Sequence, residues 1–287
     1  MTVELLAGDC RAKLSKFLEN TFDACVTDPP YAMGMDVWDK NVPTADIWRA
    51  VLRTMKPGAF LLASSPALYH RMATNVEDAG FKIQDQVMWM TTTKMAKYNR
   101  LKPAHEPFVV AQKPYEGTLN SNFNKWGRGK INIDDARVPW DKAPPVNVAD
   151  GAKRRKFGKG AAKGGAAQYG TIEADPNGRY PMNIIGDVEP EHQNYFYAPR
   201  VSRSERGDYN DHVSPKPISL MEYLIKIYTP HSGVILDPFC GSGSTGIAAL
   251  NEGRSFVGID LSQHYLDITQ RRIAERHADV VYTQIAS

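Results

Sequence analysis

The sequence has few cysteines and no long apolar run, and both absences limit what the protein can be. Its three cysteines, Cys10, Cys25 and Cys240, form an odd set without metal-ligand spacing. We therefore expect no disulfide framework, no metal site and a reducing intracellular environment. No segment approaches the roughly 20 apolar residues of a membrane span. Charged residues interrupt residues 1–17, so we also expect no secretory signal.

The excess of positive charge is also small. The chain of 287 residues has a formal net charge of +3, with 42% hydrophobic and 23% charged residues. This is the composition of a globular protein with one substantial core and room for an insertion. Any attraction to nucleic acid must therefore come from uneven placement of the basic residues rather than from their total.

Short apolar runs alternate with helical patterns in both halves of the chain. Strands are predicted over residues 3–6, 23–27, 59–63, 82–90, 108–111, 233–236, 255–259 and 280–284. Helices are predicted over residues 10–18, 44–55, 66–79, 217–228, 244–251 and 262–276. Such alternation predicts an α/β fold with a Rossmann-like, mostly parallel and doubly wound sheet.

The pattern stops between residues 113 and 212, where glycine, proline, asparagine and lysine dominate. We therefore divide the chain into residues 1–112, a large irregular basic insertion over 113–212, and residues 213–287. Within the insertion, residues 151–165 hold six basic and no acidic residues among glycines and alanines, which predicts a mobile basic loop. A solvated linker is the alternative, but basic side chains interleaved with aromatic ones suit phosphate contact and base stacking.

A carboxylate, two prolines and an aromatic ring directly follow one of the buried strands. Asp28, Pro29, Pro30 and Tyr31 come after residues 24–27, at the carboxyl end of a strand, where open α/β sheets bind ligands. The prolines have no N–H, so this backbone offers only carbonyl acceptors. A planar group with two N–H donors fits: Asp28 accepts one, the Pro29 carbonyl the other, and Tyr31 stacks on the ring. A proline-rich turn is the structural alternative.

A glycine-rich loop joins a strand to a helix near the other end of the chain. Residues 234–245 place Gly241 and Gly243 there, where the backbone can approach a ligand closely. The spacing is not the Gly-x-Gly-x-x-Gly of dehydrogenases. Asp260 ends the next strand, a position from which a carboxylate can accept from both hydroxyls of a ribose. A helix N-cap is the alternative role for Asp260.

These two motifs, in this order and separated by a basic insertion, resemble the amino-methyltransferases of DNA in the β arrangement. The resemblance covers residues 3–112 and 210–277. It implies a class I methyltransferase sheet, with a catalytic half at 1–112, a target recognition region at 113–212 and a cofactor half at 213–287. It also implies S-adenosylmethionine as cofactor and duplex DNA as substrate, in a cytoplasmic enzyme of a prokaryote or phage. A homodimer and a cognate restriction endonuclease are further partners that the resemblance allows.

The resemblance assigns site residues by position. The implied catalytic set is Asp28, Pro29, Pro30 and Tyr31. The implied cofactor residues are Asp9, Cys10, Asp28, Ser214, Lys216, Asp237, Pro238, Phe239, Gly241, Gly243, Ser244, Thr245 and Asp260. The chain departs from the family twice: residues 212–214 read His-Val-Ser where His-Pro-Thr is usual, and the ribose acid is aspartate where glutamate is more frequent.

Basic residues in two regions are the predicted DNA contacts. Lys94, Lys97 and Arg100 follow a predicted strand, where the alternatives are a solvated loop and phosphate contact beside a flipped base. The other predicted contacts lie in the insertion: Lys125, Arg128, Lys153, Arg154, Arg155 and Lys156.

The favoured reaction is methyl transfer to the N6 amine of an adenine flipped out of the duplex. Adenine is favoured over the N4 amine of cytosine because the family's cytosine members more often have serine at position 28. Methylation at C5 of cytosine is disfavoured because none of the three cysteines follows a proline. His105 and Glu106 are interpreted as a structural pair, since they lack the His-Glu-x-x-His spacing of a metal site.

Two other hypotheses remain open. An RNA or protein-amide methyltransferase is disfavoured by Asp28, where those relatives commonly have asparagine, and by the order of the two motifs. A catalytically silent DNA-binding protein is disfavoured by the intact Asp28 and the intact glycine-rich loop. Binding of DNA without methyl transfer would favour that last hypothesis.

Overall fold

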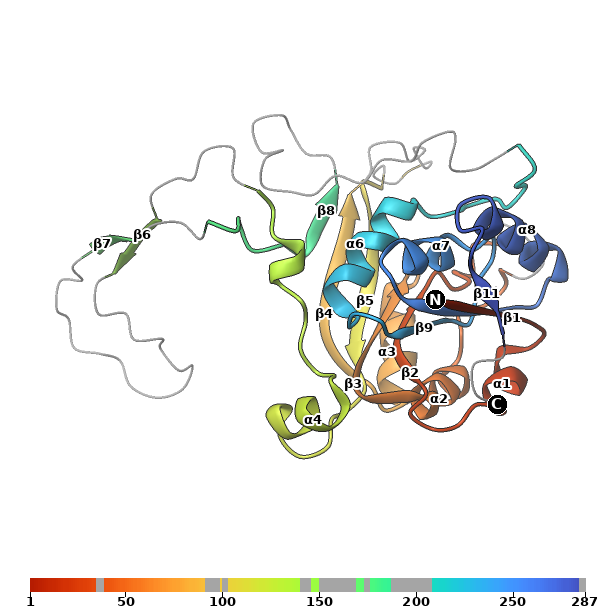
Figure 1. Ribbon diagram of the computed structural model, residues 1–287, viewed down its shortest axis with the longest axis horizontal. Helices are drawn as coiled ribbons and strands as arrows, with labels where there is room; N and C mark the ends of the chain where they lie inside the picture. The colour runs from red at the N-terminus through yellow and green to blue at the C-terminus, as the bar shows by residue number, and fades with distance from the viewer. Residues whose placement is uncertain are drawn as a thin grey trace.

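A mixed sheet of nine strands runs through the part of the chain that the computed structural model describes, which is residues 1–34, 39–90, 99, 103–139, 146–149, 169–172, 176–186 and 208–283. Its strands are β1 (Thr2–Ala7), β2 (Phe22–Thr27), β3 (Met55–Ser64), β4 (Lys82–Met90), β5 (His105–Gln112), β8 (Ile184–Gly186), β9 (Val234–Asp237), β10 (Ser255–Asp260) and β11 (Val281–Tyr282). They lie in the order β11-β1-β10-β9-β2-β3-β5-β4-β8 (Figure 1). Only β5 runs antiparallel to its neighbours in this sheet. The predicted α/β fold with a mostly parallel sheet is confirmed.

Helices cover both faces of the sheet. They are α1 (Cys10–Leu14), α2 (Ala45–Thr54), α3 (Tyr69–Asp78), α4 (Leu119–Trp126), α6 (Ile218–Tyr228), α7 (Ser244–Asn251) and α8 (Gln263–Ala274). Buried side chains of α1, α2 and α3 pack into one apolar cluster, and those of α6, α7 and α8 into the other. The sheet is therefore doubly wound.

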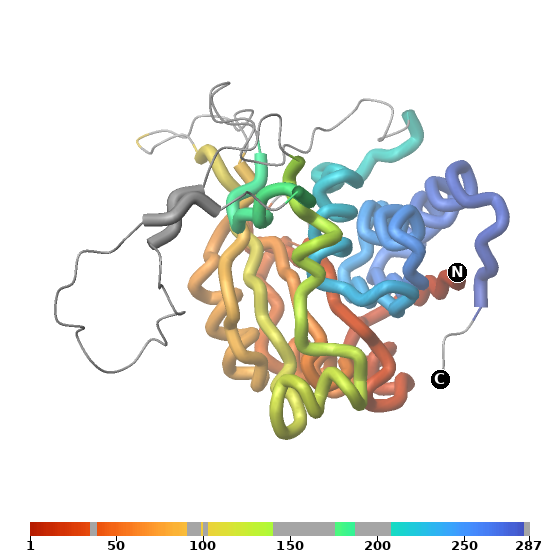
Figure 2. The backbone as a smooth tube through the Cα atoms, turned by 60° about the vertical axis from the view of Figure 1, so that its left-hand side comes forward, coloured from red at the N-terminus to blue at the C-terminus, as the bar shows by residue number. Residues whose placement is uncertain are grey.

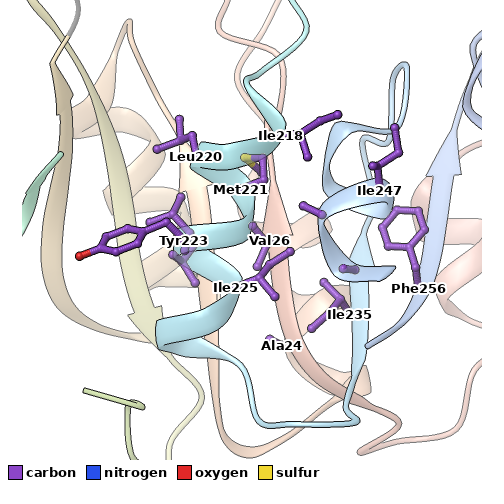
Figure 3. Packing of buried hydrophobic residues seen from close by; sticks show 14 of the residues in the cluster. Ala24, Val26, Ile218, Leu220, Met221, Tyr223, Ile225, Ile235, Ile247 and Phe256 are labelled. Atoms are coloured by element: carbon purple, nitrogen blue, oxygen red, sulfur yellow. The ribbon is translucent and has the colours of Figure 1, made fainter. Parts of the chain in front are cut away.

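The central strand β2 is buried along its whole length, which is why its sequence reads as an apolar run. Successive residues face opposite clusters: Ala24 and Val26 pack with α6 and α7 (Figure 3), whereas Cys25 packs on the side of α1 and α2. Hydrogen bonds pair β2 in parallel with both β3 and β9. The carboxyl ends of β2 and β9 consequently meet at one edge of the sheet.

The predicted insertion contributes more regular structure than its sequence indicated. The helix α4 packs against β3, and the amide of Asn122 donates to the Pro57 carbonyl (3.0 Å). The chain then runs beside α6 (Figure 2), where Asn132 donates to the Thr229 carbonyl (2.8 Å). The strand β8 extends the main sheet next to β4. The prediction of irregular structure is therefore wrong for α4 and β8. A separate antiparallel pair is formed by β6 (Val146–Ala149) and β7 (Tyr169–Ile172).

Three predicted element boundaries are also wrong. The strand β3 begins at Met55, directly after α2, so Pro57 lies inside the strand and not in a loop that ends the helix. Pro57 occupies an irregular stretch where the register with β2 shifts. The helix expected from residue 66 begins only at Tyr69, because Ser65 still bonds to the Pro107 carbonyl (2.8 Å). The first helix ends at Leu14 rather than near residue 18.

Some sequence predictions fall outside the described residues. They concern the basic loop over residues 151–165 and the DNA contacts Lys94, Lys97, Arg100, Lys153, Arg154, Arg155 and Lys156. Among the described residues, no helix combines the length and the apolar character needed to cross a membrane.

Candidate active site

All the residues predicted for catalysis and cofactor binding line one pocket at the carboxyl ends of β1, β2, β9 and β10. They are Asp9, Cys10, Asp28, Pro29, Pro30, Tyr31, Ser214, Lys216, Asp237, Pro238, Phe239, Gly241, Gly243, Ser244, Thr245 and Asp260. The pairing of β2 with β9 joins two motifs that are far apart in the sequence. Where these two strands end, the Thr27 hydroxyl donates to Oδ1 of Asp237 (2.7 Å). The position is the one at which open α/β sheets bind their ligands.

Asp28 directly follows the last residue of β2 and has one carboxylate oxygen available to a ligand. Its Oδ2 accepts a hydrogen bond from Nζ of Lys216 (2.6 Å). Its Oδ1 is buried and has no hydrogen-bond partner within the described part of the chain. A buried acceptor without a donor is costly, so this oxygen is suited to accept from an amine bound in the pocket.

Lys216 is buried, and its ammonium faces the catalytic set. Besides Asp28, its Nζ donates to the Tyr31 hydroxyl (2.7 Å) and lies 3.4 Å from Oε2 of Glu106. An ammonium has three donors, and these three neighbours match that number. The sequence placed Lys216 with the cofactor residues, but its contacts in the structure are with the catalytic side. Glu106, interpreted as half of a structural pair with His105, lies beside this ammonium instead.

Tyr31 forms part of the pocket wall and is only 4% exposed. Its hydroxyl accepts from Lys216 and also bonds with the Ser64 hydroxyl (3.3 Å). The ring is therefore held in place through its hydroxyl. Stacking of this ring on a substrate stays a prediction, and the anchoring of the hydroxyl is a role that the sequence did not indicate.

The glycine-rich loop requires glycine at two positions. Gly241 and Gly243 have φ angles of +50° and +79°, in the left-handed region. A Cβ atom at Gly243 would lie 2.5 Å from Cγ2 of Thr269, and one at Gly241 would lie 2.8 Å from the His212 ring. The helix α7 begins directly after this loop, at Ser244. Its first amides lack intrahelical partners and suit an anionic group such as a carboxylate.

Asp260 holds the glycine-rich loop in place. Its Oδ2 accepts from the Gly241 amide and its Oδ1 from the Ser262 amide, both at 2.8 Å. Burial raises the pKa of this carboxyl, while these two amides favour its charged form. Ser262, not Asp260, is the N-cap of α8, so the N-cap alternative is wrong. Each carboxylate oxygen has further lone pairs, which leaves capacity for a ribose hydroxyl.

Asp237 is a buried carboxylate of the pocket that forms no ion pair with the described residues. It is 2% exposed, and burial raises its pKa to about 7 despite hydrogen bonds from Thr27 and from the Phe239 amide (3.1 Å). A bound cation would favour its charged form. The nearby Ser244 hydroxyl is buried and has no hydrogen-bond partner among the described residues.

The pocket therefore fits S-adenosylmethionine group by group. The buried Asp237 suits the α-ammonium, the beginning of α7 suits the α-carboxylate, and Asp260 suits the ribose. The apolar ring of Phe239, which packs edge-on against Trp48 with centroids 6.1 Å apart, lies in the same wall.

Several residues that line the pocket were not predicted. Ile47 and Met221 look in the sequence like ordinary core positions of amphipathic helices, so no pattern distinguishes them. Tyr265 also lines the pocket, and His212 packs edge-on against it with centroids 4.8 Å apart. His212 had the one available signal, because it opens the imperfect motif that ends at Lys216.

The two predicted DNA contacts that the structure describes lie far from this pocket. Both belong to the α4 region, which Figure 1 shows at the end of the sheet opposite to the arrowhead of β4. Arg128 is mostly buried and pairs with the buried carboxylate of Asp23, which Lys56 also contacts. Its guanidinium ties the insertion to β2, which is a structural role that the sequence did not indicate. Lys125 is exposed and pairs with Glu116 (2.7 Å).

The fold and pocket define a class I methyltransferase, and comparison with known proteins identifies its family. The model of the N6/N4 family described as DNA methylase matches residues 22–271. The chain belongs to this family, which confirms the resemblance to the β-class amino-methyltransferases. The type II methyltransferase M.ScaI of Streptomyces caespitosus is 26% identical, over 94% of this chain and 81% of the relative. The type II methyltransferase M1.MboII of Moraxella bovis is 24% identical, over 90% of this chain and 92% of the relative.

Solved structures share the fold. The TM-score is 0.58 for TTHA0409 of Thermus thermophilus complexed with S-adenosyl-L-methionine, at 18% identity and with 100% of both chains covered. It is 0.55 for the complex of M1.HpyAVI with the same cofactor, at 18% identity, covering 94% of this chain and 100% of the other. For the PvuII DNA methyltransferase (cytosine-N4-specific) it is 0.62 at 15% identity, covering 96% and 88%. The predicted fold class and cofactor are confirmed: the protein is a DNA amino-methyltransferase that uses S-adenosylmethionine.

Proposed function

We propose that the protein methylates the N6 amine of an adenine flipped out of duplex DNA, within a specific sequence. The observation that supports this most is the buried Oδ1 of Asp28, an acceptor without a partner among the described residues, at the edge of the cofactor pocket. An exocyclic amine inside a base pair cannot reach such a buried atom. The base must therefore leave the helix before the reaction.

The substrate amine is a weak nucleophile because its lone pair is delocalised into the base. Hydrogen bonds from its two N–H groups to Oδ1 of Asp28 and to the Pro29 carbonyl favour a more tetrahedral nitrogen. They also direct its lone pair at the methyl group. S-adenosylmethionine supplies that methyl group on a sulfonium, which is a good leaving group. The residues of the chain hold the amine in line with the methyl group. Such alignment can lower the activation free energy by up to about 7–11 kcal/mol. Asp28 is the first acceptor for the proton that the amine releases, and water is the alternative.

Lys216 orients Asp28 in this mechanism. Its ammonium holds Oδ2, so the other carboxylate oxygen is fixed toward the amine site. The same ammonium anchors the Tyr31 hydroxyl, and Glu106 offsets its charge. This role differs from the cofactor contact that the family resemblance implies for Lys216.

Adenine is proposed over cytosine because position 28 is aspartate. The N4 amine of cytosine is the second candidate, since the same two acceptors fit either amine. The structural similarity to a cytosine-N4-specific enzyme reflects the shared fold and does not favour either base. The identity of the modified base is therefore the first quantity to measure.

Methylation of duplex DNA with labelled S-adenosylmethionine, followed by mass spectrometry of the nucleosides, tests the proposal. We expect N6-methyladenine, and N4-methylcytosine would support the second candidate. Asp28→Ala is expected to abolish transfer while cofactor binding persists, and the exposed Asp78→Asn serves as the control. Transfer to RNA or to a protein amide alone, or binding of DNA without transfer, would favour the other two hypotheses.

Lys216→Met separates the two roles that are possible for that residue. If Lys216 orients Asp28, the variant loses kcat, and its Kd for S-adenosylmethionine does not rise, because no cofactor contact is lost. If Lys216 binds the cofactor, that Kd rises instead. The double variant Lys216→Met/Glu106→Gln removes a cation and an anion together, and it controls for the charge left behind by the single change.

We further propose that the protein is the modification component of a restriction–modification pair, since both named relatives are type II methyltransferases. Single-molecule sequencing of DNA from cells that express the protein gives the modified base and its context. Protection of that DNA from a cognate endonuclease tests the pairing.

Size-exclusion chromatography with light scattering tests the homodimer.

A further inference from the structure

The backbone after Pro30 is organised around one buried carboxylate, that of Asp39. This side chain is 0% exposed. Its Oδ1 accepts hydrogen bonds from the amides of Tyr31 (2.6 Å) and Ala32 (2.8 Å), and its Oδ2 accepts from the amide of Met33 (3.1 Å). The carbonyl of Asp39 also accepts from the Gly34 amide (3.0 Å). Four successive amides therefore bond to a single residue.

These contacts select an uncommon backbone conformation. Ala32 has a φ of +60°, in the left-handed region that residues other than glycine rarely adopt, and Gly34 has a φ of +69°. Such a conformation persists only when its surroundings fix it. The carboxylate of Asp39 supplies the acceptors that do so here.

These hydrogen bonds, which we call the Asp39 clamp, fix the peptide unit that joins Pro30 to Tyr31. Pro29 and Pro30 have no N–H, so the Tyr31 amide is the first donor after Asp28, and it points at Asp39. Because a peptide unit is planar, the Pro30 carbonyl must point the opposite way. The proline rings fix two further torsions. The segment from Asp28 to Pro30 is thus held between the end of β2 and the Asp39 clamp.

We propose that Asp39 is a positioning residue for methyl transfer, which sets the direction of the Pro29 carbonyl and the Tyr31 ring toward the substrate base. This inference rests on the proposed function, because it assumes that these groups receive the amine. Asp39 lies outside the cofactor pocket lining. It also keeps three amide donors directed away from a site that must accept protons from an amine.

The kinetic test compares Asp39→Ala, Asp39→Asn and the control Asp78→Asn. We expect Asp39→Ala to lose about 100-fold in kcat, the loss that a misplacement of about 1 Å produces, with an unchanged Kd for S-adenosylmethionine. Asp39→Asn retains one acceptor oxygen and is expected to retain intermediate activity. Wild-type kcat in Asp39→Ala would overturn the proposal. A parallel loss of cofactor binding and of thermal stability would also overturn it, because it would show a general role in folding.

Amide hydrogen exchange provides a measurement that does not depend on activity. In Asp39→Ala the amides of Tyr31, Ala32 and Met33 are expected to exchange faster, while those of the glycine-rich loop over residues 238–243 stay unchanged. Unchanged exchange at all three amides would overturn the clamp. If the wild-type protein transfers no methyl group to DNA, the proposed function fails, whereas an active wild type with an equally active Asp39→Ala variant refutes the role of Asp39 alone.

Discussion

The carboxyl group of Asp237 illustrates how this pocket combines stability with function at the scale of a single residue. Burial raises its pKa from an ordinary 3.8 to about 7. In the unfolded chain the proton leaves near the ordinary value, whereas the folded protein keeps it up to about pH 7. The folded state therefore binds the extra proton in this window, and its stability falls as the pH rises from about 4 to about 7.

Asp237→Asn is expected to stabilise the cofactor-free protein at pH 8 and to abolish cofactor binding. The amide keeps an acceptor oxygen for the Thr27 hydroxyl and the Phe239 amide but carries no buried charge. The shift to about 7 corresponds to at most about 4 kcal/mol of unfolding free energy. Binding is expected to be lost because Asp237, the proposed carboxylate partner of the cofactor's ammonium, then carries no charge. In the wild type, the same linkage predicts weaker cofactor binding as the pH falls below 7.

Thermal unfolding at pH 5 and pH 8, together with calorimetric titration of S-adenosylmethionine, measures both effects. Asp78→Asn, which alters an exposed carboxylate, is expected to change neither. A variant that is less stable than the wild type at pH 8, or that binds the cofactor with wild-type affinity, would contradict this account of Asp237.

Among the secondary-structure elements, α7 has a left-handed glycine near each end, but only one of the two faces the pocket. Gly243 precedes the helix with a φ of +79°, and Gly253 follows it with a φ of +74°. A Cβ at Gly243 would meet Thr269 of α8, whereas a Cβ at Gly253 would meet nothing within 4 Å. Substitutions at these two glycines therefore distinguish the cost of backbone strain from the cost of a steric clash with α8.

Gly253→Ala is expected to destabilise the protein by about 1–2 kcal/mol, the cost of a left-handed alanine, and to leave cofactor binding unchanged. Gly243→Ala is expected to destabilise it further and to weaken cofactor binding, because the loop must move away from Thr269. Chemical denaturation and calorimetry of both variants measure this difference. Equal effects of the two substitutions would show that the contact with α8 is unimportant.

The elements that the sequence predicted correctly are those with a strong local pattern. β2 is buried along its length and contains the apolar run of residues 24–26, and α6 has apolar residues at helical spacing, so both were assigned near their observed bounds. The helix α4 was not predicted because its mixed sequence has no helical periodicity. It is stabilised by contacts with β3 and by its own capping box at Thr118. Pro57 was predicted to end the helix, but it lies within β3, at the irregular stretch where the pairing with β2 shifts register.

The candidate site shows the same division. Asp237 and Asp260 each end a strand and Asp28 directly follows one, and the ends of parallel strands meet at one edge, so their convergence could be predicted. The orientation of Lys216 could not be predicted, because it depends on contacts with Asp28 and Tyr31 of one motif and with Glu106 of β5. The role of Asp39 had no sequence signal either, since an aspartate in a loop is ordinary until its hydrogen bonds are seen.

In the molecule as a whole, a small net charge makes the location of the basic residues decisive for DNA binding. The net charge is +3, so no general attraction to DNA dominates. The basic residues of the α4 region lie at the end of the sheet opposite to the pocket (Figure 1). We therefore expect that a duplex that delivers a base to Asp28 does not extend to that end. Residues 151–165 therefore remain the main candidate for electrostatic contact, although they lie outside the described residues.

Neutralisation of the basic loop is accordingly expected to weaken DNA binding and to flatten its dependence on salt. Lys153, Arg154, Arg155 and Lys156 are changed together to glutamine, and each lost phosphate contact lowers the slope of log K against log salt by about 0.9. The control is Lys125→Gln with Lys130→Gln, which removes exposed charge near α4 and is expected to leave that slope unchanged. Titrations of labelled duplex at several salt concentrations measure both. An unchanged slope in the loop variant would show that the loop does not contact phosphate, and a reduced slope in the control would show that DNA reaches the α4 end after all.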